Sequence, residues 1–279
     1  MSQQASVGFS QRIKLEWLEK TSNLALAGNT PEQIKAALDE TLRDKLSVGS
    51  DARAGNRVKS ISILMNIWAT GPEKLKPLQS EGLALLSCLP REAHLPVHWG
   101  MSMATYPFFG TVAETVGRLL RLQGDLTSAQ IQRRLREQFG ERETIFRAAR
   151  RILRCFVDWG VLQDSPQKGM YVPAPTRPIE DRQLAAWMIE AVLRASGLSY
   201  STLSSIGQSP MLFPFVLPTL NLGVLQVNER LDSHRQGLDE DVITLRSGVI
   251  FPAAEIGGNG ERCRGERRPS SRGKRQFSP

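Results

Sequence analysis

The sequence predicts a mainly α-helical fold: a helical N-terminal domain, two smaller modules that each end in a β-hairpin, and a disordered basic tail. Three observations support this prediction. Apolar residues recur at helical spacing through most of residues 13–195. Short apolar runs that suit strands follow helical segments near residues 161–172 and 224–245. From about residue 257, the chain is rich in Gly, Ser, Pro and Arg and has too few apolar residues to form a core.

The composition is that of an ordinary globular protein, because 41% of the 279 residues are hydrophobic and 23% are charged. The formal net charge is +8, and much of it lies near the C-terminus, where seven basic residues oppose only Glu261 and Glu266. The expected tail, residues 251–279, either raises non-specific affinity for nucleic acid through counterion release or has little role. Both alternatives stay open.

No targeting or membrane segment is expected. The first residues, MSQQASVGFS, lack the basic and apolar regions of a secretory signal. The longest apolar run, residues 211–227, is interrupted by Pro214 and Pro218 and is too short to span a bilayer. We therefore expect a cytoplasmic protein that makes no membrane contact.

The helical N-terminal domain is expected over residues 1–105. Its first helix ends at Gly28, and Thr30 then acts as the N-cap of a second helix that has proline at its first position. A third helix is expected over residues 53–70. The apolar, aromatic segment 83–109 joins this domain to the next.

The middle module, residues 106–178, begins with a helix expected over residues 111–122. After a break at Gly124, Thr127 and Gln130 have the spacing of a capping box, which predicts the start of a second helix. A glycine ten residues later ends that helix, and a third helix follows within a few residues.

The third helix of this module carries an arginine stripe. Within the segment RETIFRAARRILRCFVDWGVL, residues 142–162, helical periodicity places four arginines on one face: Arg147, Arg150, Arg151 and Arg154. The opposite face is apolar and comprises Ile145, Ala148, Ile152, Phe156 and Trp159. Guanidinium groups bind phosphate and guanine edges bidentately, so double-stranded DNA is the expected partner. The alternative is an ordinary solvated basic face.

Two short strands are expected next, at residues 161–162 and 170–172, with Lys168 at the tip of the turn between them. Residues 111–173 therefore resemble the winged helix-turn-helix family in helix order, capping box, tight turn and terminal hairpin. The resemblance implies that the arginine-striped helix enters the major groove and that the hairpin, or wing, lies along a neighbouring backbone. The expected DNA-binding residues are Arg133, Arg136, Arg142, Thr144, Arg147, Arg150, Arg151, Arg154 and Lys168.

Two acidic residues oppose this interpretation. Glu141 and Glu143 lie in the first turn of the arginine-striped helix, where they suit the helix dipole but repel phosphate. We therefore expect contact with the DNA backbone more than base-specific reading. The alternative is that the module serves protein interaction, since a fold does not fix a function.

The third part, residues 179–250, is expected to be a second winged-helix-like module. Helices are predicted at residues 181–195, 199–206 and 211–220, and strands at 224–229 and 241–245. Between residues 180 and 246, five basic residues oppose eight acidic residues, and the resulting net charge of −3 suits phosphate poorly. We expect this module to contact protein partners of a larger complex or a second copy in a homodimer.

We expect no enzymatic activity, no cofactor and no metal. His94 and His98 have the i, i+4 spacing of a helical metal pair, but Pro96 between them argues against a regular helix, and no convincing further ligand follows. Ordinary packing of these histidines is favoured. The sequence has neither a phosphate-binding glycine loop nor a nucleophile in a recognisable setting. A nucleic-acid-processing enzyme is a minor alternative.

The order of parts also resembles a narrower family. A helical N-terminal domain, the aromatic run WGMSMATYPFF before a winged helix, and a second winged-helix-like part resemble the small DNA-binding component of BREX-type bacteriophage-defence systems over most of residues 9–245. The basic tail is not part of that pattern. The resemblance implies an accessory role in host defence beside larger enzymatic partners. The alternatives are a transcriptional regulator and an adaptor whose winged helices hold a larger complex together.

Overall fold

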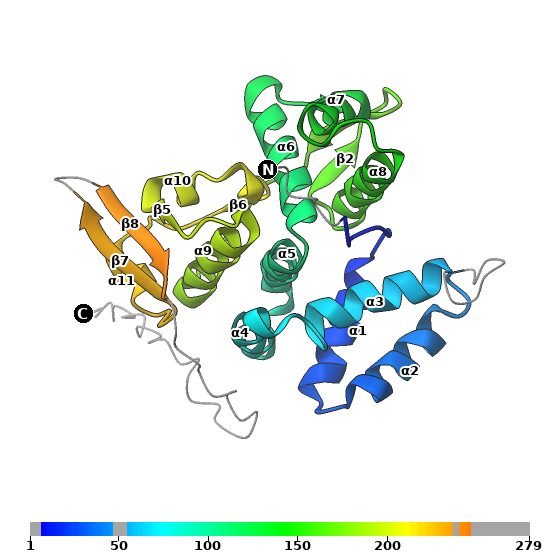
Figure 1. Ribbon diagram of the computed structural model, residues 1–279, viewed down its shortest axis with the longest axis horizontal. Helices are drawn as coiled ribbons and strands as arrows, with labels where there is room; N and C mark the ends of the chain where they lie inside the picture. Colours follow the sequence, from blue (N-terminus) through cyan, green and yellow to red (C-terminus); the bar gives the residue numbers. More distant parts are fainter. Residues whose placement is uncertain (1–6, 47–54, 237–239, 247–279) are drawn as a thin grey trace, which may run out of the picture.

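The computed structural model describes residues 7–46, 55–236 and 240–246, which are mainly α-helical. The predicted tail, residues 251–279, lies outside the described residues. Figure 1 shows α1–α3, α6–α8 and the elements after α9 arranged around α4 and α5. In the described part of the chain, no helix has the length and apolar character needed to cross a membrane.

Five helices form the N-terminal part: α1 (Leu15–Leu26), α2 (Pro31–Leu42), α3 (Asn56–Trp68), α4 (Lys76–Cys88) and α5 (His94–Thr105). Short 3₁₀ turns precede α4 and α5, at Glu73–Leu75 and Arg91–Ala93. Thr30 caps α2 as expected, because its hydroxyl accepts a hydrogen bond from the Gln33 backbone while the Gln33 side chain accepts one from the Thr30 backbone. The three helices expected first in the chain are therefore confirmed.

Contrary to the prediction, His94 and His98 lie on one regular helix, α5, that also contains Pro96. Because α5 starts at His94, Pro96 lies in its first turn, where backbone N–H groups have no intrahelical acceptor and proline costs little. Most of α5 is buried, and the helix lies at the centre of the molecule (Figure 1). Gly100 allows α9 to approach closely, since a Cβ atom here would lie 2.5 Å from the Trp187 ring.

Trp99 of α5 is fully buried at the centre of an aromatic cluster. Its ring contacts five aromatic rings from α6, from α8 and its end, and from the segment after α10: Phe109, Phe156, Trp159, Phe213 and Phe215. Its indole N–H donates to the carbonyl oxygen of Met211 at 3.1 Å. The three parts of the chain thus share one hydrophobic core, and the domain boundaries stay a prediction.

The middle module consists of α6 (Pro107–Gln123), β1 (Leu126–Thr127), α7 (Ser128–Phe139), α8 (Glu143–Asp158), β2 (Leu162–Asp164) and β3 (Met170–Pro173). β3 pairs antiparallel with both β1 and β2, so the strand order is β1-β3-β2. The helices and the hairpin agree with the sequence prediction. β1 was not predicted, because two residues are too few to reveal strand alternation.

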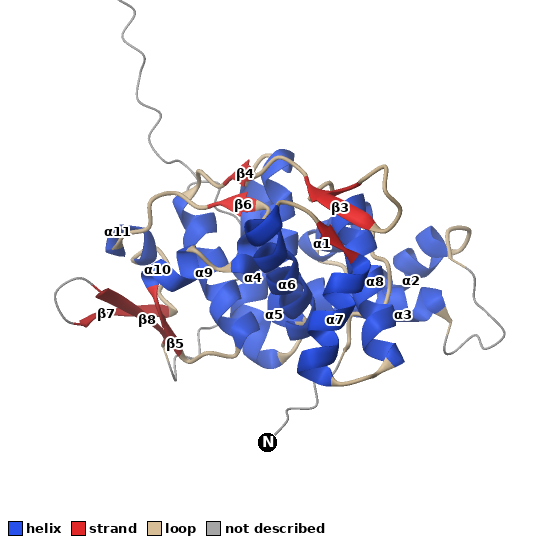
Figure 2. Cartoon of the chain, turned by 90° about the horizontal axis from the view of Figure 1, so that it is seen from above, coloured by secondary structure: helices blue, strands red, loops and turns tan. Residues whose placement is uncertain are grey.

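The third part consists of α9 (Arg182–Ser196), β5 (Tyr200–Thr202), α10 (Leu203–Gly207), a 3₁₀ turn (Pro210–Leu212), α11 (Leu222–Leu225), β7 (Leu231–Gln236) and β8 (Glu240–Leu245). β8 pairs antiparallel with both β5 and β7, so the order β5-β8-β7 matches that of the middle module. Both parts therefore run helix, strand, helix, helix, hairpin. Figure 2 shows the two sheets well apart.

Several elements of the third part differ from the prediction. The expected helix at residues 199–206 begins as strand β5, whose pairing with β8 cannot be read from local periodicity. The expected helix at residues 211–220 is a 3₁₀ turn followed by β6 (Phe215–Val216), because its prolines lack the N–H groups that a helix needs. β6 pairs in parallel with β4 (Arg177–Pro178). The expected strand at residues 224–229 is mostly the end of α11 and a turn.

A buried ion network joins the third part to α4. Glu190 of α9 is fully buried and accepts hydrogen bonds from Arg194, Arg230 and Asn228. The guanidinium of Arg230 also contacts the Glu81 carboxylate of α4. Burial alone would raise the pKa of Glu190, but the contacts with these partners lower it below its usual value, so the carboxylate stays charged.

Candidate nucleic-acid interface

α7 and α8 meet at a short turn whose geometry the sequence explains. Gly140, which ends α7, has φ +73°, a conformation that favours a residue without Cβ. At the other end of α7, the Thr127 hydroxyl accepts a hydrogen bond from the Gln130 backbone at 3.2 Å, and the Gln130 side chain accepts one from the Thr127 backbone at 2.7 Å. The predicted capping box is therefore confirmed.

The apolar face of α8 is buried as the sequence predicts, and it comprises Ile145, Ala148, Ile152, Phe156 and Trp159. Burial of this face fixes the rotation of α8 about its axis. The four arginines therefore lie on the opposite face of the helix, away from the core. The predicted amphipathic character of the helix is confirmed.

The four arginines of the stripe have different surroundings. Arg147 and Arg150 have side chains that are 59% and 53% exposed, and both approach the same Oε1 atom of Glu143, at 3.5 and 3.2 Å. Arg154 pairs with Asp164 of β2 at 2.7 Å, and this hydrogen bond raises the pKa of Arg154. Arg151 is half-buried and donates to the backbone carbonyl of Ser10. Arg147 and Arg150 are thus the stripe residues that can reach a large ligand without releasing another element.

Residues 9–13, here called the N-terminal strap, cover the C-terminal half of α8. The Trp159 indole donates to the Ile13 carbonyl at 2.9 Å, and the Ile13 backbone N–H lies 3.1 Å from Cys155 Sγ. The Arg12 guanidinium pairs with the Asp158 carboxylate, which raises the pKa of Arg12. These contacts assign the second half of α8 a packing role.

Cys155 lies beneath the strap and is a free, buried thiol. Burial raises its pKa to about 12. Because the thiolate is the reactive form of cysteine, this side chain is chemically inert at neutral pH.

The predicted α7 residues Arg133 and Arg136 are exposed. Arg133 Nε lies 3.9 Å from a Glu137 oxygen. Arg136 Nε lies 3.2 Å from Glu141, and its guanidinium lies 5.5 Å from the ring centroid of Phe146 on α8. Arg136 therefore brings the charge of α7 to the first turns of α8.

The three remaining predicted residues are also exposed. Arg142 is the N-cap residue of α8, Thr144 lies in its first turn, and Lys168 lies in the turn between β2 and β3. Within the described residues, neither Arg142 nor Lys168 forms an ion pair. Their charges are thus available to a phosphate.

Arg134 is a basic surface residue that the sequence argument omitted. Its side chain is 49% exposed and pairs with Glu137 at 3.1 Å. The signal was present, because α7 buries only a narrow stripe, Ile131 and Leu135, and a narrow apolar stripe leaves a wide polar face. Arg12 was also missed, and its pairing with α8 has no local signal in the sequence.

The net charge of this region favours an anionic partner. Residues 126–173 contain nine basic and five acidic residues, so their net charge is +4. Four of those acidic residues already pair with arginines of the same region: Glu137, Glu141, Glu143 and Asp164. The exposed excess of positive charge lies on α7, on the first half of α8 and on the β2–β3 turn.

The two histidines of α5 meet a carboxylate from α1. His94 Nδ1 lies 3.0 Å and His98 Nε2 3.2 Å from the same Glu19 oxygen. The Trp68 indole donates to Nδ1 of His98 at 3.0 Å, so the proton of the neutral His98 ring is on Nε2 and no lone pair remains there for a metal. The described residues contain no group of three or more His, Cys, Asp or Glu side chains that could hold a metal ion.

The cluster shifts two pKa values. Burial lowers the pKa of His98, although the adjacent Glu19 opposes this effect. Burial alone would raise the pKa of Glu19, but contacts with His98 and His94 lower it to about 2. The cluster is therefore a largely buried polar contact between α1 and α5.

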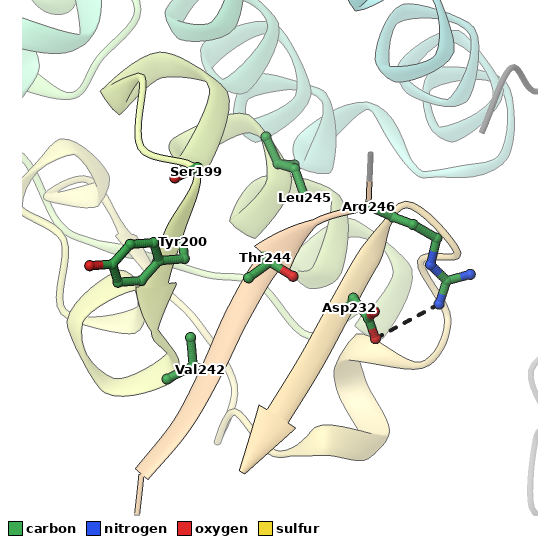
Figure 3. A pocket seen from close by; sticks show the side chains of 7 residues that line it. All are labelled: Ser199, Tyr200, Asp232, Val242, Thr244, Leu245 and Arg246. Carbon is green, nitrogen blue, oxygen red and sulfur yellow. Dashed lines mark ion pairs between the residues drawn. The ribbon is translucent and has the colours of Figure 1, made fainter. Parts of the chain in front are cut away.

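The third part has an open hollow on its small sheet (Figure 3). Tyr200 of β5, Thr244 of β8 and Asp232 of β7 line it, and Asp232 pairs with Arg246 at 3.9 Å. The hollow is open and is lined by both polar and apolar residues, whereas pockets that hold small ligands are usually enclosed and mostly apolar.

No family model, no curated protein and no solved structure matches the chain.

Proposed function

We propose that residues 107–173 form a winged helix-turn-helix and that the chain is a non-enzymatic protein that binds double-stranded DNA. The observation that carries the proposal is the set of exposed cations on α7, the first half of α8 and the β2–β3 turn: Arg133, Arg134, Arg136, Arg142, Arg147, Arg150 and Lys168. The order α6-β1-α7-α8-β2-β3 and the strand order β1-β3-β2 support the family assignment.

In this proposal, the main contact is with the phosphate backbone. Arginine and lysine reach phosphates of any sequence, and they gain affinity by releasing the counterions of DNA. Glu143 lies in the first turn of α8, the part of a recognition helix that faces the bases in the docking mode usual for helix-turn-helix proteins. Its negative charge would therefore disfavour close approach to base edges that accept hydrogen bonds. Binding is therefore steeply salt-dependent and only weakly sequence-dependent.

The decisive experiment is a salt series of duplex binding, measured by fluorescence anisotropy with a labelled random-sequence duplex. The variant Arg147→Ala/Arg150→Ala removes two exposed guanidinium groups. Its slope of log affinity against log salt should be shallower by about 2, because each lost phosphate contact removes about one unit.

The matched control is Arg43→Ala/Lys45→Ala, which changes the net charge equally at exposed residues beyond the end of α2. Figure 1 places α2 away from α7 and α8. The control should retain wild-type affinity and slope. If the wild type binds duplex no better than the α8 variant, the DNA-binding proposal fails.

A second candidate function is that of an adaptor, which a specific difference between the two modules favours. α11 occupies the place in the third part that α8 occupies in the middle module, yet it spans only Leu222–Leu225. With this short helix and a net charge of −3, the third part suits a protein contact better than a DNA contact. We propose that it binds a protein partner while the middle module binds DNA.

The resemblance to the small DNA-binding component of BREX-type systems extends the proposal to an accessory role in phage defence. A transcriptional regulator is the alternative. The genes next to its own test this extension: enzymes of a defence system would support it, and a neighbourhood without them would contradict it.

A further inference from the structure

Glu143 is the acidic residue that contacts both exposed arginines of α8 in the free protein. Arg147 Nε and an Arg150 terminal nitrogen converge on its Oε1 atom, at 3.5 and 3.2 Å. The spacings i, i+4 and i, i+7 place all three side chains on one side of the helix. The Glu143 side chain is 62% exposed, so nothing in the core holds this carboxylate in place.

We propose that Glu143 is an internal counter-ion that limits the affinity of this surface for duplex DNA. The inference rests on the proposed DNA binding. In the free protein, the carboxylate neutralises part of the charge of Arg147 and Arg150. When phosphates replace the carboxylate as partners of the arginines, it stays on the same side of α8 and repels them. It therefore weakens binding in two ways: it neutralises the arginines in the free protein, and it repels phosphate in the complex.

Glu141 is a second internal counter-ion, and its partner is Arg136 of α7. It lies in the turn before α8 and not, as expected, in the first turn of that helix. Its side chain is 76% exposed and lies 3.2 Å from Arg136. The two carboxylates therefore oppose three of the cations proposed to contact phosphate. Exposed ion pairs of this kind are weak, so a polyanion can displace them.

A positioning role for Glu143 predicts the opposite result. If the carboxylate served to orient Arg147 and Arg150 for DNA, its removal would weaken binding. Both arginines are more than half exposed, so their conformations are set mainly by solvent and by the ligand. This exposure favours the counter-ion role.

The test compares Glu143→Gln and Glu141→Gln with the wild type in the same anisotropy assay, using the same random-sequence duplex at low and high salt. Each variant keeps the side-chain shape and removes one negative charge. At low salt, Glu143→Gln should bind about threefold more tightly, as expected for one charge several ångströms from a phosphate in water. The gain should shrink at high salt, because counterions screen exposed charges.

Glu73→Gln is the matched control. Glu73 is 82% exposed, pairs with Lys76 at 2.5 Å, and precedes α4, outside the middle module. This variant should bind as the wild type does. Circular dichroism checks that Glu143→Gln keeps its helices, since an acidic residue in the first turn also favours the helix dipole.

The outcomes separate the two proposals. Tighter binding by Glu143→Gln with no change in Glu73→Gln supports the counter-ion role. Unchanged or weaker binding by a folded Glu143→Gln, while the wild type still binds duplex, overturns this role and leaves the DNA-binding proposal standing. If Glu143→Gln and Glu73→Gln gain affinity equally, the gain reflects the net charge of the protein, and the counter-ion role is also overturned. Absence of wild-type binding overturns the DNA-binding proposal itself.

Discussion

Arg150 and Arg151 are neighbours in the sequence but face different surroundings. Arg150 is exposed beside Glu143, whereas Arg151 is half-buried and donates to the Ser10 carbonyl of the N-terminal strap. From the sequence, both arginines were expected to bind DNA, because both lie on the same basic stripe. Their separate roles arise because one helical step of about 100° turns a side chain from solvent toward the strap.

Replacement of Arg150 and of Arg151 by alanine should affect different properties of the protein. Arg150→Ala should weaken duplex binding and leave the free energy of unfolding nearly unchanged, because an exposed ion pair contributes little. Arg151→Ala should lower the free energy of unfolding by about 1–3 kcal/mol, because it removes a charged donor from a partly buried carbonyl. Urea unfolding and anisotropy measure the two effects. Loss of binding without loss of stability in Arg151→Ala would contradict this division.

Glu19 makes stability depend on acid pH. Its pKa is about 2 in the folded protein and 4.5 for the ordinary side chain. The unfolded state therefore binds the proton more readily, so the contribution of Glu19 is fully present above pH 4.5 and is lost as the pH falls from 4.5 to about 2. Glu19→Gln should lower the melting temperature at neutral pH and flatten its dependence on pH within that window.

The control for this variant is Glu16→Gln. Glu16 lies on the same helix, but its side chain is 55% exposed and pairs with Lys45 at the surface. Its replacement should change the melting temperature little. Equal acid sensitivity of the wild type and Glu19→Gln would show that the α1–α5 contact does not titrate as described.

Close helix packing depends on glycines whose role appears only in three dimensions. Gly117 of α6 faces the 3₁₀ turn after α10, and a Cβ atom there would lie 2.1 Å from the Pro210 carbonyl oxygen. Gly110 of the same helix has room, since its nearest neighbour would be 3.5 Å away, at Ala195. Helical periodicity treats these two glycines alike.

Gly117→Ala should therefore lower the free energy of unfolding by about 1–3 kcal/mol, the usual cost of forcing an extra carbon into a packed contact. Gly110→Ala should leave it unchanged or raise it by up to about 1 kcal/mol, because alanine favours the helix. Chemical denaturation of both variants checks the contrast. Equal destabilisation would mean that α6 tolerates neither side chain.

Elements with strong local signals could be predicted from the sequence, and elements made by distant partners could not. Thr127 and Gln130 lie three residues apart, so their capping box and the start of α7 were readable. β5 forms by pairing with β8, and β1 forms by pairing with β3. Because these partners lie far away in the sequence, no local pattern predicts either strand. The candidate site follows the same rule: the amphipathic character of α8 was predictable, whereas the strap over its second half was not.

At the scale of the molecule, Arg230 links the third part to the helical core. Its side chain is 15% exposed and contacts both Glu190 and Glu81. Removing one member of a buried ion network leaves its partners charged and without compensation. The network therefore contributes to the connection between α9 and α4.

Arg230→Ala should lower the free energy of unfolding by about 3–5 kcal/mol. Arg246→Ala is the control, since its side chain is 46% exposed and lies 3.9 Å from Asp232, a pair expected to contribute about 0–1 kcal/mol. Thermal unfolding measures both. Duplex affinity of the folded fraction should be the same in the two variants, because neither residue belongs to the middle module.

The N-terminal strap has a consequence for synthesis of the chain. Ser10 and Arg12 bind residues that follow them by 141 and 146 positions, so a growing chain exposes the strap long before α8 leaves the ribosome. Contacts between segments so far apart in the sequence raise the contact order of a domain, and a high contact order slows folding. Because residues 10–13 form part of the surroundings of α8, the proposed DNA-contacting helix is fully packed only when these two distant segments are both in place.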